Sequence, residues 1–586
     1  MNGDSRQAVA ILREPRRAGW RRMQHLAGVL TTTRIAEIPA LLEELEAAVG
    51  KQGYCAAGFM AYEAAPALDE ALQTHDGAGF PLAWFGVFKA SQPLTRLPAS
   101  AEQQPGLGLA WQSEVTAAHH QAGIAAIRRY IQAGDIYQVN YTYRLHCRAD
   151  TDPWALFVQR VGDQAPPYAA YIDTGEWVIC SLSPELFLRL EGEQVWSRPM
   201  KGTAARGLWP AADRVEAAAL RRSAKERAEN AMIVDMVRND LGRIATVGSV
   251  VVPALFELER YPTLWQMTSL VQAHTQARIP AILRAAFPAA SITGAPKTRA
   301  MQIIRQLETS PRRIYTGTIG FMAPDHTAQF NVAIRTLLFH RPSGAWEYGV
   351  GGGIVWDSVP ACEWQESLTK SRVVTSSPTP FALLETLLWT PERGYFLLRY
   401  HLNRLAESAA YFALAFDQCD LQAKLQALAS DFSQRPQRVR IQLEQDGRLT
   451  TDWRELGAED MRFKPVTLAA APIDRDDVFM YHKTTRRAVY TAARASRPAY
   501  EDVILFNTNA EVTESTLANL VITTADGRLI TPPIASGLLA GTYRAWLVAQ
   551  GLVQAQVVSV EAMFASPRVY LMNSVKGLQR VTVDRL

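Results

Sequence analysis

Residues 348–370 read YGVGGGIVWDSVPACEWQESLTK, a glycine-rich apolar run that leads into a segment with helical spacing. The glycines permit close backbone approach, so their amides could bind a carboxylate, although a bulge or a tight turn explains them equally well. The second part puts Glu363, Glu366 and Lys370 on one helix face. Strand-like runs such as EWVICSLS (176–183) and VAIRTLLF (332–339) lie upstream among helical segments, which predicts a mixed α/β fold.

A second helical segment with carboxylates lies upstream, over residues 224–238. Met232 and Met236 belong to its apolar stripe, and Glu229 points to the same side, with Glu226 one turn earlier. Buried carboxylates are costly unless they are paired or bind a metal. Two converging carboxylate faces would suit Mg²⁺, but two solvated helix faces explain the same spacing.

The clearest boundary in the chain is VVTSSPTP, residues 373–380, because proline and small polar residues interrupt the periodic pattern there. The sequence therefore predicts one domain over 1–372 and a second over 381–586. In the second, LLRYHLNRLAESAAYFALAF (397–416) predicts a strand that runs into an amphipathic helix. Short strands are expected at EDVILFNT, TLANLVITT and GRLITPP.

Composition excludes several classes of protein. The 586 residues include 61 basic and 57 acidic side chains, a net charge of +4, and this balance gives no indication of a nucleic-acid partner. No apolar run is long enough to span a membrane, and no secretory signal is expected. Five scattered cysteines without a CxxC pair favour a reducing compartment, so we expect a cytoplasmic location.

Several runs occur in a fixed order between residues 134 and 372, and together they resemble the chorismate-utilising enzymes. This family includes anthranilate synthase component I, aminodeoxychorismate synthase component I and isochorismate synthase. The resemblance implies a β-sandwich-like core flanked by helices. The runs are SLSPELF, RPMKGTAARG, KERAENAMIVDMVRNDLGRI, FPAASITGAPKTRAM, IYTGTIGF, NVAIRT and GVGGGIVWDSVPACEWQESLTKSR.

The resemblance also implies the roles of individual residues toward Mg²⁺ and the dianionic substrate chorismate. Mg²⁺ would be held by Glu229 and Glu366, with Glu226 and Glu363 beside them. The residues implied to hold the substrate's carboxylates and ring are Arg335, Tyr315, Lys370, the amides of Gly351 and Gly352, and the segment Thr293, Gly294 and Ala295.

Lys201, in PMKGT, separates the possible reactions. In the resembling families, anthranilate synthases have alanine at this position, whereas aminodeoxychorismate synthases have lysine. Glu185 in SPELF also fits the pattern of the aminodeoxychorismate synthases. The implied reaction has Lys201 attack the ring while Glu185 protonates the leaving hydroxyl, after which ammonia displaces the lysine. A strand-end lysine in an exposed ion pair is the structural alternative. No segment resembles a glutaminase, so ammonia is expected from a separate glutamine amidotransferase subunit.

The second domain offers Lys483 beside His482, Arg486 and Arg487, and cationic neighbours favour loss of the lysine proton. The runs RYHLNRL, YHKTTRR, NTNAEVTESTLANLVI and SGLLAGTYRAWL resemble fold-type IV pyridoxal-phosphate enzymes, which have two lobes and are often homodimers. The resemblance implies that Lys483 binds pyridoxal 5′-phosphate covalently. The other implied cofactor residues are Glu514 at the pyridine nitrogen, with Glu511 as the alternative, and Arg404, Thr542, Tyr543 and Ser574 at the phosphate.

Taken together, the two resemblances imply a fused enzyme that makes 4-aminobenzoate for folate biosynthesis. The first domain would aminate chorismate to 4-amino-4-deoxychorismate, and the second would eliminate pyruvate as aminodeoxychorismate lyase does. Three alternatives stay open from the sequence. The second domain could be an amino-acid transaminase or a module without catalytic activity, and the first could form anthranilate.

Overall fold

The computed structural model describes residues 8–17, 19–77, 79–99, 110–375 and 380–585, and the chain divides into two compact units. Unit 1 comprises Met1–Ala204 and Ala219–Pro378. Unit 2 comprises Thr379–Leu586 together with Ala205–Ala218. The predicted domain boundaries contained no such inserted segment, and residues 376–379 of the predicted linker lie outside the described residues.

Unit 1 is built on antiparallel strands in two layers that share the long strand β2 (Gly19–Thr32). The first layer runs β14 (Gly294–Ala295), β6 (Gln138–Arg148), β18 (Ala345–Ile354), β17 (Thr336–His340), β8 (Trp177–Ser181), β7 (Ala170–Asp173), β1 (Val9–Glu14) and β2, with β5 (Gln112–Ser113) also on β6. The second runs β2, β4 (Ala83–Leu94), β3 (Cys55–Met60), β15 (Thr318–Ala323), β16 (Thr327–Val332), β9 (Leu186–Glu191), β10 (Gln194–Arg198), β13 (Leu264–His274) and β12 (Val251–Arg260), with β11 (Met200–Ala205) also on β13.

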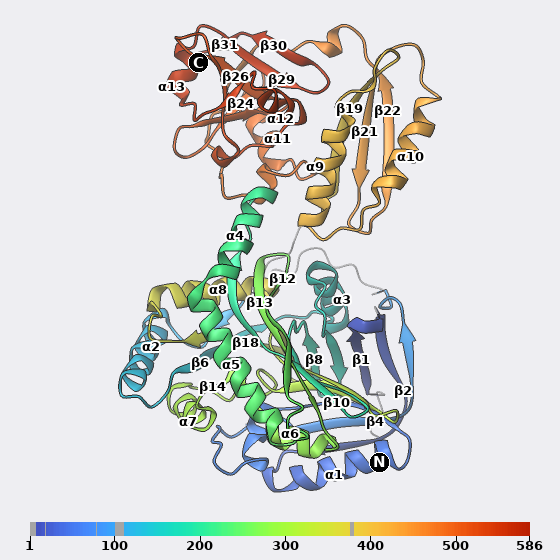
Figure 1. Cartoon of the computed structure of the whole chain (residues 1–586), viewed down its shortest axis with the longest axis vertical. Coiled ribbons are helices and arrows are strands. Elements are labelled where there is room, and N and C mark those ends of the chain that lie inside the picture. Colours follow the sequence, from blue (N-terminus) through green and yellow to red (C-terminus); the bar gives the residue numbers. More distant parts are fainter. Residues whose placement is uncertain (1–7, 18, 78, 100–109, 376–379, 586) are drawn as a thin grey trace. The chain divides into compact units, whose positions relative to one another are not determined.

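Side chains from both layers form one buried cluster, in which Phe59 and Phe321 of the second layer meet Ile179 of the first. Helices cover the outer faces of the layers (Figure 1). The predicted sandwich-like core with flanking helices is therefore confirmed. The helices are α1 (Ile38–Gly50), α5 (Ala224–Gly242) and α6 (Ile279–Ala286) on the second layer, α3 (Pro153–Gln164) on the first, and α2 (Ala117–Gln132), α7 (Lys297–Leu307) and α8 (Pro360–Thr375) near β6 and β18.

One predicted strand of unit 1 is divided in the structure. The run VAIRTLLF ends β16 at Val332 and begins β17 at Thr336, and these strands belong to different layers. Arg335 between them has φ +50°, in the left-handed region, so the extended backbone cannot continue through it. The apolar pattern predicted a single strand because hydrophobicity does not change at this turn.

Unit 2 has two lobes, as predicted. In the first lobe, α9 (Leu398–Tyr411) and α10 (Gln418–Ala429) pack on the sheet β20 (Gly394–Tyr395), β19 (Leu383–Thr390), β21 (Gln437–Leu443) and β22 (Leu449–Glu455). The second lobe contains α11 (Ala488–Ala495), α12 (Thr542–Ala549), α13 (Val560–Ala565) and a sheet of β23 (Val466–Leu468), β24 (Val503–Phe506), β25 (Val512–Ser515), β26 (Asn519–Thr523), β27 (Leu529–Thr531), β28 (Gln554–Ala555), β29 (Val569–Asn573), β30 (Gly577–Val581) and β31 (Val583–Asp584).

The predicted strands at 501–508, 516–524 and 527–533 are confirmed as β24, β26 and β27. The strand predicted at the start of 397–416 is wrong. Leu397 has φ +55° and α9 begins at Leu398, so the left-handed residue starts the helix directly. In the described part of the chain, no helix combines the length and apolar character needed to cross a bilayer.

Candidate active sites

The first site is centred on Lys201, which lies on β11. Its Nζ points at Gly353 of β18, because a Cβ built on Gly353 would come within 2.9 Å of that atom. Burial lowers the pKa of Lys201, and the positive charge of Lys370 acts in the same direction, while Glu229 and Glu185 oppose the shift. The predicted nucleophile is therefore surrounded by charged groups, and its environment favours the neutral amine.

Glu185 lies immediately before β9 and is 3% exposed. Ser291 Oγ donates a hydrogen bond to Glu185 Oε1 at 2.6 Å. Burial raises the pKa of Glu185 to about 7, although Ser291 and Lys201 act to lower it. A carboxyl that keeps its proton near neutral pH beside a lysine is suited to act as a general acid.

The four predicted metal ligands lie on two helices, Glu226 and Glu229 on α5 and Glu363 and Glu366 on α8. Burial raises the pKa of Glu226, Glu229 and Glu363, and for each of them the charge of Glu366 adds to the rise. The pKa of Glu366 is lowered, chiefly by Lys370, whose Nζ lies 2.8 Å from Glu366 Oε1.

Among the described residues, no three His, Cys, Asp or Glu side chains converge into a ready-made metal site. Mg²⁺ is commonly held by one or two carboxylates and completed by substrate oxygens and water, so it does not need such a cluster. Glu366 of α8 raises the pKa of Glu226 and Glu229 of α5, which indicates that a cation between the two helices would be stabilised. The donor set therefore fits Mg²⁺.

The glycine run forms the end of strand β18, paired with β6. A Cβ on Gly351 would fall 2.2 Å from the Tyr141 carbonyl oxygen, and one on Gly352 would lie 3.5 Å from both Glu363 Oε2 and Lys370 Nζ. Lys370 Nζ also donates to the Gly351 carbonyl oxygen at 3.1 Å. The bare backbone thus lets the charged side chains approach this strand.

Thr293, Gly294 and Ala295 lie in and before β14, which pairs with β6 beside Gln138. A Cβ on Gly294 would fall 2.3 Å from the Gln138 carbonyl oxygen, and a Cβ on Gly353 would fall 2.2 Å from Gln138 Nε2. The buried amide of Gln138 therefore joins this segment to the strand that Lys201 approaches. The sequence analysis missed Gln138, since a lone glutamine in a strand has no spacing signal.

Tyr315 and Arg335 both lie near Tyr348 of β18. Burial raises the pKa of Tyr348, and the charges of Arg335 and Tyr315 both act on it. Tyr315 packs on Gly349, where a Cβ would fall 2.1 Å from the ring. Burial lowers the pKa of Arg335. The structure thus brings Lys201, Glu185, the four carboxylates and Lys370 together, and groups Tyr315 and Arg335 further along β18.

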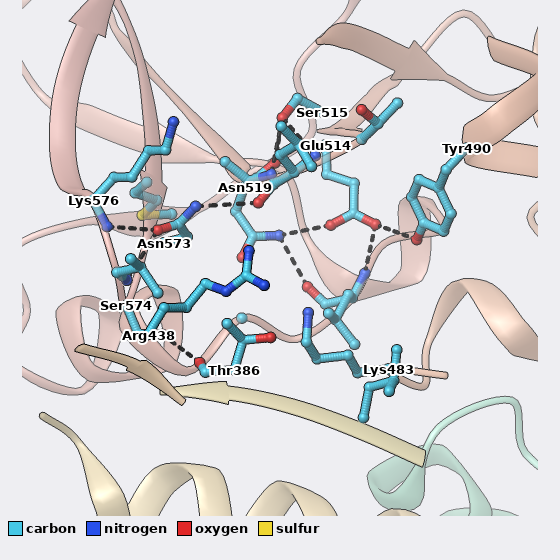
Figure 2. A pocket seen from close by; sticks show the side chains of 18 of the residues that line it. Thr386, Arg438, Lys483, Tyr490, Glu514, Ser515, Asn519, Asn573, Ser574 and Lys576 are labelled. Carbon is cyan, nitrogen blue, oxygen red and sulfur yellow. Dashed lines mark hydrogen bonds between the residues drawn. The ribbon is translucent and has the colours of Figure 1, made fainter. Parts of the chain in front are cut away.

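The second site is a cavity of about 790 Å³ in unit 2, lined by both lobes. Figure 2 shows Lys483 below Glu514, with Ser574 on the opposite wall. Arg404 and Thr542 also line the cavity, whereas Tyr543 is not among the described lining residues. The Tyr543 ring packs instead on Phe396 and Trp546.

Burial lowers the pKa of Lys483 to about 8. The cations Arg404 and Arg487 add to this shift, while Glu385 and Glu514 oppose it. An amine with this pKa has a far larger neutral fraction near neutral pH than an exposed lysine, and the neutral form can react with an aldehyde. Lys483 therefore loses its proton more readily than an exposed lysine, which favours covalent attachment of pyridoxal phosphate.

Glu514 is held by three donors. Tyr490 Oη and the Leu539 amide donate to Oε1 at 2.8 and 3.2 Å, and Asn519 Nδ2 donates to Oε2 at 3.1 Å (Figure 2). Burial raises the pKa of Glu514 to about 7, while the hydrogen bonds from Leu539 and Tyr490 act to lower it. The alternative candidate, Glu511, is not among the described lining residues of the cavity.

Arg404 forms a bidentate ion pair with Glu385, at 2.8 and 2.7 Å, and donates to the Ala540 carbonyl oxygen at 3.1 Å. His401 Nδ1 lies 2.6 Å from Glu385 Oε2, and His401 Nε2 lies 3.2 Å from Thr542 Oγ1. Burial alone would raise the pKa of Glu385, but Arg404 and His401 lower it to about 2. Arg404 is thus fixed at the cavity wall beside the start of α12.

The sequence analysis missed Glu385, His401, Tyr490 and Asn519. Each is a polar residue in an ordinary strand or helix pattern, and each becomes recognisable only through its contact with a predicted residue. A Cβ on Gly541 would fall 1.9 Å from Asn519 Oδ1, so glycine is required where α12 begins. The lysine, the acid and this helix start fit pyridoxal phosphate.

Two further cations face the cavity from β21. Arg438 and Arg440 alternate with Val439 and Ile441, which are buried under the helices of the first lobe. Within the described residues, neither arginine forms an ion pair, and Arg438 Nε is buried without a hydrogen-bond partner. Figure 2 shows Arg438 directed into the cavity. This wall therefore offers two guanidinium groups to an anionic ligand.

Comparison with protein families gives two matches. Residues 10–376 match the family described as chorismate binding enzyme, and residues 382–583 match amino-transferase class IV. The two matches together cover almost all of the described chain.

Individual relatives match parts of unit 1. "Aminodeoxychorismate synthase component 1" of Escherichia coli (strain K12) is 40% identical over 262 residues, which is 44% of this chain and 57% of that protein. The Bacillus subtilis (strain 168) protein of the same name is 37% identical over 282 residues, 47% of this chain and 60% of its own length. The chain thus spans somewhat over half of these relatives.

Among solved structures, anthranilate synthase component I from Streptococcus pneumoniae TIGR4 covers 64% of this chain and 94% of its own. It has a TM-score of 0.53 and 24% sequence identity. This likeness supports the fold of the first region and no more than the fold.

Proposed function

Since the chain belongs to the chorismate binding enzyme family over residues 10–376 and carries an amino-transferase class IV domain over residues 382–583, we propose that it makes 4-aminobenzoate from chorismate in two steps. Unit 1 aminates chorismate to 4-amino-4-deoxychorismate. Unit 2 then eliminates pyruvate from that product. The product 4-aminobenzoate would serve folate biosynthesis.

The amination is supported above all by the buried pair of Lys201 and Glu185. In the proposed reaction, the Lys201 amine forms a bond to C2 of the ring, both ring double bonds shift, and the C4 hydroxyl leaves as water with the proton of Glu185. Ammonia then bonds to C4 and the lysine leaves from C2. The lowered pKa of Lys201 favours its neutral amine, and the pKa of about 7 lets the nearby Glu185 donate a proton near neutral pH.

The carboxylates of Glu229 and Glu366, with Glu226 and Glu363 beside them, would hold Mg²⁺. The metal would supply positive charge for the ring carboxylate of chorismate. Lys370 lies beside these groups and would add a further donor for substrate oxygens.

The remaining predicted residues of unit 1 would orient the substrate. Arg335 and Tyr315 would hold the enolpyruvyl carboxylate together with the amides of the glycine strand. The segment Thr293–Ala295 would border the ring. These roles follow from the resemblance of the motifs, and the shared contact of Arg335 and Tyr315 with Tyr348 supports their acting as one group.

Ammonia would come from a separate glutaminase subunit. The name of the Escherichia coli relative, component 1, describes one part of a larger assembly. Free ammonium would replace this source in an assay with the isolated chain.

In unit 2, bound pyridoxal phosphate would supply an electron-withdrawing ring that stabilises negative charge on the carbon bearing the amine. Lys483 would carry the cofactor, and Glu514 would hold a proton at its pyridine nitrogen. Thr542, the Tyr543 amide, Ser574 and Arg404 would bind the phosphate. The amine of Lys483, once released, would remove the proton from C4 of the substrate.

The two cations on β21 favour the lyase over a transaminase for neutral amino acids. The product of the proposed first reaction carries two carboxylates, and Arg438 and Arg440 offer two guanidinium groups with no ion-pair partner among the described residues. A substrate with a single carboxylate would leave one of these two half-buried guanidinium groups without an anionic partner.

The direct test is to incubate the chain with chorismate, ammonium, Mg²⁺ and pyridoxal phosphate and to separate the products. We expect 4-aminobenzoate from the unmodified chain, no amination with Lys201→Ala, and accumulated 4-amino-4-deoxychorismate with Lys483→Ala. Accumulation by the unmodified chain would favour a transaminase or a non-catalytic second unit. Formation of 2-aminobenzoate, retained in Lys201→Ala, would favour an anthranilate-forming enzyme.

A further inference from the structure

Unit 2 contains a segment that the chain supplies from far upstream, Ala205–Ala218. It directly follows strand β11, which carries Lys201, and it includes the first part of α4 (Pro210–Arg222). Neither family match explains why a segment inside residues 10–376 belongs to the other unit. Its contacts indicate what it does there.

The segment is a rigid turn. Arg206 Nε and Nη2 donate to the two oxygens of Asp213 at 2.7 and 2.8 Å, and both residues are buried. The Gly207 amide donates to Asp213 Oδ1 at 3.1 Å. A Cβ on Gly207 would fall 2.2 Å from the Asp213 nitrogen, so the turn requires glycine. A buried bidentate pair of this kind holds one geometry.

Arg206 also contacts the first lobe of unit 2. Its guanidinium lies 4.1 Å from the centre of the Tyr411 ring, at the end of α9, and donates to the Tyr411 carbonyl oxygen at 3.3 Å. The Tyr411 ring lies 4.5 Å from the ring of His482, whose Nδ1 is 2.9 Å from Ser408 Oγ. His482 immediately precedes Lys483.

Trp209 contacts the same stretch from the other side. Its ring stacks on Tyr481 with centroids 5.1 Å apart and an interplanar angle of 23°. Leu208 and Trp209 both pack on a buried cluster that contains Met480, Tyr481 and Tyr490. Tyr490 is the donor to Glu514 Oε1. The segment is therefore packed behind both residues that would hold the two ends of the cofactor ring.

We propose that Arg206 and Trp209 are positioning residues for the second site, which fix residues 480–482 and keep water from the backbone behind Lys483. This inference rests on the proposed function, because it takes Lys483 as the cofactor lysine. It assigns part of the second active site to residues that precede the linker by more than a hundred positions in the sequence.

The test uses the full chain with Trp209→Ala, Trp209→Phe and Arg206→Gln. Glu216→Gln serves as the matched control, since its side chain is exposed in the same segment. The measurements are the dissociation constant of pyridoxal phosphate, the wavelength and pH titration of the bound cofactor's visible absorbance, and chorismate consumption. Trp209→Ala and Arg206→Gln should weaken cofactor binding about tenfold and shift the titration. Trp209→Phe should restore most of the binding, and chorismate consumption should stay within about twofold.

Two results would overturn the inference. One is unchanged cofactor binding and an unchanged titration in Trp209→Ala and Arg206→Gln. The other is loss of chorismate consumption in these variants with the cofactor properties intact, since the segment would then serve the Lys201 site. Failure of the unmodified chain to bind pyridoxal phosphate would refute the proposed function of unit 2 itself, which is a distinguishable outcome.

Discussion

At the scale of single residues, the two lysines owe their chemistry to burial. An exposed lysine has a pKa of about 10.4 and is almost fully protonated at neutral pH. Desolvation is the largest cause of the lowered pKa at both Lys201 and Lys483. The motif predicts each lysine as a nucleophile, but only the folded surroundings lower its pKa.

The rate at which apoenzyme binds pyridoxal phosphate should report the pKa of Lys483. Only the neutral amine reacts, so the rate should rise about tenfold per pH unit at low pH and level off above about pH 8. Arg404 and Arg487 lower the pKa of Lys483, and Glu385 and Glu514 raise it. Stopped-flow absorbance from pH 6 to 10 measures the profile. A rate that still rises beyond pH 9.5 would show that the surroundings do not lower this pKa.

Substitution of the β21 cations should weaken substrate binding selectively. Arg438→Gln or Arg440→Gln should raise KM for 4-amino-4-deoxychorismate by about ten- to a hundredfold, because a charge-assisted hydrogen bond to a carboxylate contributes about 1.5–3 kcal/mol. Cofactor affinity should stay the same. Arg435→Gln is the matched control, with a side chain that is 76% exposed. Equal KM values in all three variants would show that the substrate binds elsewhere.

At the scale of elements, helices α5 and α8 each contribute two carboxylates to one acidic site. Glu366→Gln should raise the Mg²⁺ concentration needed for half-maximal amination by at least about tenfold, because it removes a proposed Mg²⁺ ligand. Loss of a residue that only orients a metal ligand already costs about 10–100-fold in metal affinity. Removal of Mg²⁺ by a chelator should stop amination and leave cofactor binding in unit 2 intact.

Glu44→Gln, on the exposed face of α1, is the control for this Mg²⁺ titration. Both variants are assayed with ammonium and saturating chorismate while Mg²⁺ is varied. The metal assignment fails if Glu366→Gln and Glu44→Gln require the same Mg²⁺ concentration.

Element patterns in the sequence predicted α5, α8 and the short strands of unit 2, because their apolar spacing is local. The same patterns failed at Arg335 and Leu397, where a positive φ ends or begins an element without any change in hydrophobicity. They also missed Glu385, whose role depends on its contact with helix α9, and Gln138, which contacts strands distant in the sequence. Motifs predicted the candidate reacting groups, and the structure was needed to find the residues that contact them.

At the scale of the whole molecule, the path of the chain limits how it can be divided. If residues 1–378 and 379–586 are produced as two chains, the first still carries Ala205–Ala218, which packs within unit 2. We expect the two chains to elute together from a size-exclusion column. Adding Arg206→Gln and Trp209→Ala to the first chain should release the second. Independent elution of the unmodified chains would contradict this packing.

The backbone passes from one unit to the other three times. The two units therefore cannot be exchanged between proteins by a cut at the linker alone. A shuffled gene that kept residues 1–378 and received an unrelated C-terminal half would leave Leu208 and Trp209 without their aromatic neighbours. Evolution by simple exchange of domains is therefore restricted in this protein. Any new C-terminal half would need an apolar surface on which Leu208 and Trp209 can pack.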